Sequence, residues 1–125
     1  SHVDMLEPNA AASLHTTADD YSRLLAGWLA EPALVALALS APVPVDPALG
    51  LSWGLGWGIE AADSGPNLWQ WGNNPGFRAF AMVSVASGNG FVLLTNSERG
   101  MPLAAALARD ALPGPHGVFR FGMLG

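Results

Sequence analysis

The sequence predicts an α+β fold, an antiparallel β-sheet with flanking helices, and three patterns support this prediction. Two apolar runs, residues 77–85 and 91–96, are separated by a short segment that contains Asn-Gly, which is typical of a β-hairpin. Large and small residues alternate over residues 51–60 with the period of a strand. Apolar residues recur with helical spacing over residues 21–29.

Two helices are expected before the sheet. Thr17 followed by Asp20 resembles a capping box, and the apolar stripe of residues 21–29 follows it. That helix must end before Pro32, which suits the first position of a second helix over residues 32–39. The second helix is apolar nearly all round, so we expect it to be buried or to be covered by polypeptide outside this sequence.

The next segments are expected to form a connector and the sheet. Residues 40–47 contain three prolines and predict an extended connector, with a proline-rich ligand for a partner module as the alternative. Over residues 51–60 the large side chains Trp53, Leu55, Trp57 and Ile59 would share one face. Further strands are expected at residues 68–71, 77–85 and 91–96.

The hairpin of residues 77–85 and 91–96 is apolar on both faces, so we expect it to be a central piece of the sheet with cover on each side. A last helix is expected over residues 102–111, ending at Pro113-Gly114. The glycine-rich tail, residues 113–125, either docks on the domain or stays loose.

Composition limits the function classes. The chain has 125 residues, 50% of them hydrophobic, so it is one domain or part of one, and its low charged fraction of 12% suggests contact with another chain. A net charge of −5 argues against nucleic acid. No apolar run is long enough to span a membrane, so we expect no membrane partner.

The side chains that could hold a cofactor or metal are few. The chain has no cysteine, which leaves the compartment open, and neither His15 nor His116 has metal-ligand spacing to another candidate ligand. We therefore expect no metal and no cofactor. Ser1-His2 is expected to be the remainder of a cleaved tag.

The candidate chemistry lies in the run Gln70-Trp71-Gly72-Asn73-Asn74-Pro75-Gly76-Phe77. Glycine permits close backbone approach, and Asn and Pro favour turns. A polar run of this kind between two strands presents backbone N–H groups at one end of a sheet. From residue chemistry alone, an ordinary tight turn and a binding site both remain open.

This run resembles the third active-site motif of the serine β-lactamase and penicillin-binding-protein-like family, which includes class C β-lactamases, DD-peptidases and related esterases. In that family Lys-Thr-Gly or His-x-Gly is followed by a short turn, Gly-Phe and a strand. Residues 12–21 resemble the family's helix start, and Leu55-Gly56-Trp57-Gly58 resembles its Gly-x-Gly-Trp strand. The three similarities occur in the family's order and cover most of residues 10–112.

The resemblance implies a serine hydrolase that transfers an acyl group to water from an ester, an amide or a β-lactam. Residues 16–112 would be the C-terminal part of the domain, after an irregular lead-in, residues 1–15. In the family the residue after the motif glycine donates its backbone N–H to the oxyanion hole, and here that residue is Asn73. Gln70 takes the position of the family's Lys or His, and Trp71, Gly72 and Asn74 would contact the substrate.

The chain also departs from the family pattern. It contains no lysine, so the nucleophile motif Ser-x-x-Lys is absent, and its one tyrosine, Tyr21, is not in a Tyr-x-Asn motif. The neutral Gln70 favours an esterase-like or altered activity. We expect this chain alone to be inactive, with the missing N-terminal half or a second copy meeting it through an open sheet edge.

A non-enzymatic binding module is the alternative function. Four tryptophans, Trp53, Trp57, Trp69 and Trp71, could form a platform on which a carbohydrate ring or a protein partner stacks. The amides of Asn73 and Asn74 would supply hydrogen bonds beside it.

Overall fold

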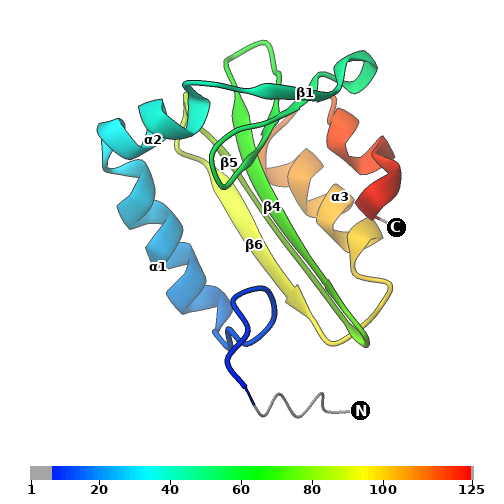
Figure 1. Ribbon diagram of the computed structural model, residues 1–125. Coiled ribbons are helices and arrows are strands. Elements are labelled where there is room, and N and C mark those ends of the chain that lie inside the picture. Colours follow the sequence, from blue (N-terminus) through cyan, green and yellow to red (C-terminus); the bar gives the residue numbers. More distant parts are fainter. Residues whose placement is uncertain (1–6, 125) are drawn as a thin grey trace.

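The computed structural model describes residues 7–124 as a six-stranded antiparallel sheet with helices on both faces, which confirms the α+β prediction (Figure 1). The strands follow one another in chain order: β1 Val43–Asp46, β2 Leu51–Trp53, β3 Gly58–Glu60, β4 Asn67–Asn74, β5 Phe77–Ser84 and β6 Gly90–Thr95. The helices are α1 Ala18–Leu29, α2 Pro32–Leu39 and α3 Met101–Ala111, with short 3-10 turns η1 Pro47–Leu49, η2 Gly117–Arg120 and η3 Gly122–Leu124.

Each face of the sheet carries its own apolar core. Trp69 and Phe80 pack on the face covered by α3, together with Met82, Met101 and Ala104. On the other face Leu68 and Val83 pack with Ile59 against partly buried side chains of α1 and α2. Strand β5 is therefore covered on both faces, as its two apolar faces predicted. The hairpin is not central, however, because β6 is an edge strand of the sheet.

The helices begin where the local signals place them. The Thr17 hydroxyl accepts a hydrogen bond from the Asp20 N–H at 3.1 Å, so the predicted cap of α1 is confirmed. Pro32 opens α2 as expected. No single helix within residues 7–124 is long and apolar enough to cross a bilayer. Taken together, α1 and α2 have the length and composition of a membrane span, but their axes are bent by 87° relative to each other.

The prediction of one strand over residues 51–60 is wrong. The Gly54 N–H donates to the Trp57 carbonyl at 2.8 Å and closes a turn, so the segment forms two short antiparallel strands, β2 and β3. Gly56 occupies the second turn position with φ +80°, which a side chain would disfavour. Because of this turn, Trp53 packs with the α3 core whereas Trp57 packs with the α1 core.

In three further segments the structure adds detail to the sequence-based expectation. The strand expected over residues 68–71 runs on to Asn74 as β4, so the motif residues lie in a strand and the turn consists of Pro75 and Gly76. The proline-rich connector is extended, and its end forms the edge strand β1 beside β2. The tail docks, since Val118 and Leu124 are buried in the α3 core.

Candidate active site

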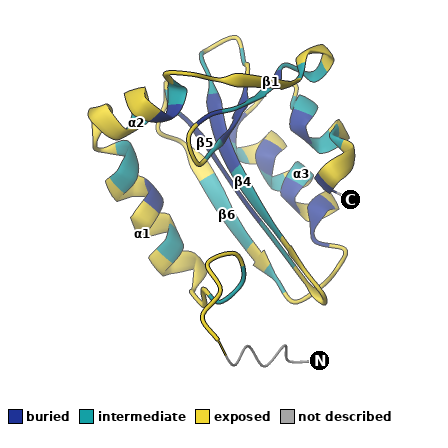
Figure 2. Cartoon of the chain, viewed as in Figure 1, coloured by how far each residue is buried: buried dark blue, intermediate teal, exposed yellow. Residues whose placement is uncertain are grey.

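The β4–β5 hairpin carries the motif residues at its exposed end (Figures 1 and 2). Asn74 pairs with Phe77 across a two-residue turn of Pro75 and Gly76, and Gly76 has φ +80°. Proline at the first turn position and a glycine with positive φ at the second are typical of a type II turn. The sequence therefore fixes the register of the hairpin, and with it the direction in which each backbone group points.

That register directs the backbone N–H of Asn73 away from β5. The N–H groups of antiparallel strands alternate between the two sides of a strand. Val85 donates to the Pro66 carbonyl that precedes β4, whereas Ser84 donates to Asn89 on the β6 side. Arg78 is an even number of residues from Ser84, so its N–H and C=O also point toward β6. Asn73 is the β4 partner of Arg78, so the two do not hydrogen-bond each other, and the N–H and C=O of Asn73 point away from β5, toward β3.

Strand β3 is too short to cover Asn73. Its last pair with β4 joins Gly58 to Trp69, because the chain turns away at residues 54–57. Beyond Trp69 the outer side of β4 is an open strand edge within the described part of the chain. The exposed Asn73 thus presents a backbone donor and a backbone acceptor, the arrangement that an extended ligand or an oxyanion can use.

Gln70 lies on β4 where this open edge begins. Its Nε2 donates to the Gly56 carbonyl at 3.1 Å, and its Oε1 accepts the Trp71 N–H at 3.1 Å. The side chain is half-buried and carries no charge. At the position that corresponds by resemblance to the family's Lys or His, this chain therefore has an amide that hydrogen-bonds to its own backbone.

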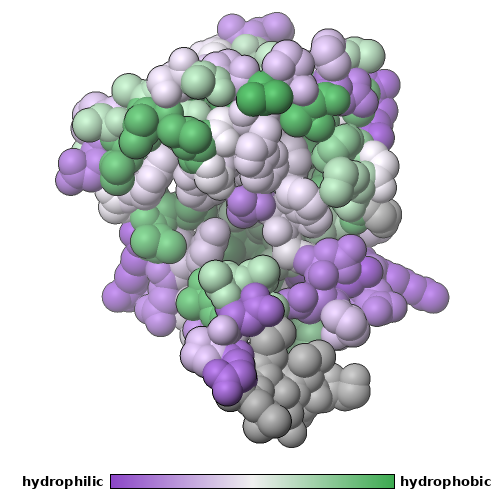
Figure 3. Space-filling view, in the orientation of Figure 1, coloured by the Kyte–Doolittle hydropathy of each residue, from purple (hydrophilic) through white to green (hydrophobic). Residues whose placement is uncertain are grey.

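A hollow of about 920 Å³ adjoins the hairpin end, on the face of the sheet that also carries α1. Gly72, Asn74 and Ala79 line it from the strands, and Leu14 and His15 line it from the segment before α1. Figure 3 shows this side of the molecule hollowed between the start of the described chain and the sheet. Most of the lining is apolar, so the hollow suits a hydrophobic group.

Two charged side chains hold the tip of the hairpin. Arg78 donates through Nη1 to the carbonyls of Asn74 and Phe77, at 3.1 and 2.8 Å. The Glu98 carboxylate accepts the Gly76 N–H at 3.2 Å. These contacts fix the turn without using the N–H of Asn73.

The four tryptophans proposed as one platform lie in two groups. Trp53, Trp69 and Trp71 contact one another on the α3 side, with ring centroids 5.5–5.9 Å apart. Trp57 lies against Trp28 of α1, 5.1 Å away. Trp69 is 1% exposed, so it is a core side chain. Carbohydrate binding stays a prediction, which a titration with oligosaccharides would test.

A second polar group, at the opposite end of β4, was missed by sequence reasoning. The buried Glu60 carboxylate accepts hydrogen bonds from Asn67 Nδ2 at 3.1 Å and from the Val118 N–H at 3.0 Å. His116 Nδ1 lies 2.7 Å from the same carboxylate. Glu60 and His116 are 56 residues apart in sequence, and no local pattern connects them.

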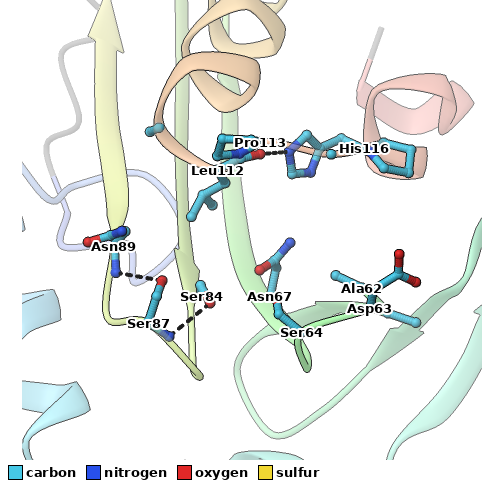
Figure 4. Close-up of a pocket in the computed structure, with 14 residues that line it drawn as sticks. Ala62, Asp63, Ser64, Asn67, Ser84, Ser87, Asn89, Leu112, Pro113 and His116 are labelled. Carbon is cyan, nitrogen blue, oxygen red and sulfur yellow. Dashed lines mark hydrogen bonds between the residues drawn. The ribbon is translucent and has the colours of Figure 1, made fainter.

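The Glu60–His116 pair holds the tail on the sheet. His116 Nε2 lies 2.6 Å from the Leu112 carbonyl, which can only accept, so Nε2 carries a proton and is not free to act as a base. A cavity of about 400 Å³ lies beside this pair, bordered by Asn67, Ser84 and His116 (Figure 4). Within residues 7–124 no group of three or more acidic, cysteine or histidine side chains is placed to hold a metal ion.

Comparison with known proteins gives one match. A family model described as Beta-lactamase matches residues 2–113. No curated protein and no solved structure matches the chain. The family match covers both the helix start and the complete β4–β5 hairpin.

Proposed function

We propose that this chain, which belongs to the β-lactamase family, forms one wall of a serine-hydrolase site. The reaction is acyl transfer from serine to water, on an ester, an amide or a β-lactam. Asn73 supplies a backbone N–H to the oxyanion, and Trp71, Gly72 and Asn74 lie next to the bound substrate. Gln70 stands at the position where the family has Lys or His.

The observation that carries this proposal is the open edge at Asn73. An oxyanion donor must be a preorganised N–H that no protein acceptor uses, and the register leaves the Asn73 N–H directed away from β5 beyond the end of β3. Removal of one such donor costs about 2.7–4 kcal/mol of transition-state stabilisation. The apolar hollow beside Gly72 and Asn74 would receive the hydrophobic part of the substrate.

The attacking serine must come from other polypeptide, because this chain has no lysine and thus no Ser-x-x-Lys. Exposed apolar side chains on α2 and β1 mark a surface that such a partner would cover. Leu37 of α2 is 54% exposed and Val43 of β1 is 64% exposed. Figure 3 shows hydrophobic residues gathered over this part of the molecule. We propose the N-terminal half of the hydrolase domain as the partner, and a second copy of this chain as the rival.

A fluorescent serine-hydrolase probe and an ester substrate test the proposal. The chain alone should show neither labelling nor turnover, and the protein that joins it to its Ser-x-x-Lys segment should show both. In that protein Asn73→Pro, which removes the N–H, should lower kcat by about 10²–10³. The matched variant Asn73→Ala keeps the N–H and should retain most of the activity. Equal activity of the two variants would contradict the oxyanion role.

A further inference from the structure

We propose that Gln70 is a positioning residue that sets the substrate class of this site. Its side chain holds the β2–β3 turn against β4, so the amide oxygen and one of the two amide N–H groups are used by the protein, and the position offers no cation to a substrate carboxylate. The site then takes acyl donors that carry no carboxylate near the reacting carbonyl. This inference rests on the proposed function and adds to it the identity of the substrate class.

The first step is the geometry of the amide. Gly56 offers a carbonyl, which can only accept, and Trp71 offers an N–H, which can only donate, so the orientation of the Gln70 amide is fixed. The side chain starts one residue past Trp69, where the last pair of β3 with β4 has been made. The Gln70 side chain therefore links β4 to the β2–β3 turn beyond the point where the backbone pairing of β3 with β4 ends.

The second step is the effect on the open edge. By the register of the hairpin, the N–H groups of Trp71 and Asn73 both point to the outer side of β4. Gln70 Oε1 occupies the first of them, which leaves the Asn73 N–H as the donor facing outward at this end of β4 in the described chain. The Gln70 bridge also anchors the exposed turn at Gly56, which borders the same edge.

The third step is charge. A lysine at this position would bring a cation with three rotatable donors, whereas glutamine brings no charge and uses a donor on Gly56. At the hairpin tip Arg78 and Glu98 have opposite charges, and Arg78 donates through Nη1 to two backbone carbonyls. The site therefore offers little net attraction for an anionic group, and a neutral acyl donor pays no charge-desolvation penalty on entering it.

Amide hydrogen exchange of this chain tests the bridge without any need for catalysis. The Trp71 N–H should exchange about tenfold more slowly than that of Asn73. Gln70→Met, of similar length but without hydrogen bonds, should abolish this difference and leave Trp69 unchanged. Gln70→Glu retains the acceptor but not the donor, so Trp71 should remain protected while the Gly56 turn loosens. Equal exchange at Trp71 in wild type and Gln70→Met would overturn the bridge.

Paired substrates test the specificity in the protein that carries this chain together with its Ser-x-x-Lys segment. The two substrates are one ester with a free carboxylate beside the scissile carbonyl and its methylated, neutral counterpart. Wild type should prefer the neutral substrate, and Gln70→Lys should shift the kcat/KM ratio toward the carboxylate about tenfold, chiefly through KM. A wild type without preference, or a ratio that Gln70→Lys leaves unchanged, would overturn the specificity. Absence of turnover with both substrates would contradict the proposed function and the substrate class with it. The amide hydrogen exchange of Trp71 tests the Gln70 bridge independently of turnover.

Discussion

The two ends of β4 use the same residue type in opposite ways. Asn67 at one end is buried, and its amide donates to the Glu60 carboxylate. Asn73 at the other end is exposed, and its backbone faces an open strand edge. The backbone N–H groups of both residues point to the same side of β4. The difference in their use therefore comes from the residues around them. Burial requires polar groups to be paired, which gives stability, while an open edge leaves them available to a ligand.

The largest expected effect is at the buried end. Glu60→Gln replaces a carboxylate with an amide. Both carboxylate oxygens accept hydrogen bonds, whereas the amide nitrogen can only donate and would face His116 or the Val118 N–H. We expect the free energy of unfolding to fall by about 3–5 kcal/mol, measured by chemical denaturation.

Glu98→Gln at the exposed end is the control for that comparison. Its amide oxygen can still accept the Gly76 N–H at the solvent-exposed turn, so the free energy of unfolding should change by no more than about 0.5 kcal/mol. Similar losses for the two variants would show that the two ends do not differ as described.

The same glycine substitution at the two ends sharpens the comparison further. A Cβ at Gly58 would lie 2.3 Å from an indole carbon of Trp69, so Gly58→Ala should cost about 1–3 kcal/mol through overpacking. A Cβ at Gly72 would meet the Ala79 Cβ at 3.3 Å, so Gly72→Ala should cost less than about 1 kcal/mol. Thermal denaturation of the two variants checks the order, and a larger loss for Gly72→Ala would reverse it.

The smallest effect concerns α1, which covers the face that carries the apolar hollow. Partial burial raises the pKa of Tyr21 above 10.0. The folded state therefore holds the phenol proton to higher pH than the unfolded state does. This contribution to stability is full below the unfolded pKa and is lost as the pH rises through the folded pKa.

Denaturation as a function of pH measures the Tyr21 contribution. Tyr21 is the one tyrosine of the chain, so Tyr21→Phe removes all tyrosine titration. We expect the variant to lose less stability than wild type in the alkaline range. Identical alkaline profiles would contradict the burial of the phenol.

The features that the sequence predicted are those with local signals. The capping residue Thr17 and Pro32 at the start of α2 each act within a few residues, and each lies where expected. The expected turn before Phe77 is also present, but it is shorter than the polar run and consists of Pro75 and Gly76. The glycine-rich segment 51–60 misled because alternating glycines fit both a strand and a tight turn. The choice between them depends on pairing with β4, which no local pattern contains.

For the candidate site, the sequence indicated residues but not their geometry. The resemblance to the family indicated Gln70 and Asn73, whereas the open edge depends on how early β3 ends, and that end is set by the misread turn. The Glu60–His116 pair joins a strand to the tail through tertiary contact alone. The contact of Gln70 with Gly56 likewise links residues that only the folded sheet brings together.

The most direct test of the open edge is the amide hydrogen exchange of Asn73 compared with that of Gly72 in the intact chain. The register predicts a Gly72 N–H held in the ladder with β5 and an Asn73 N–H without a ladder partner. Exchange at Asn73 close to the rate of an unstructured peptide, with Gly72 protected, is the result that this structure predicts. Protection of Asn73 equal to that of Gly72 would contradict the open edge and the oxyanion role built on it.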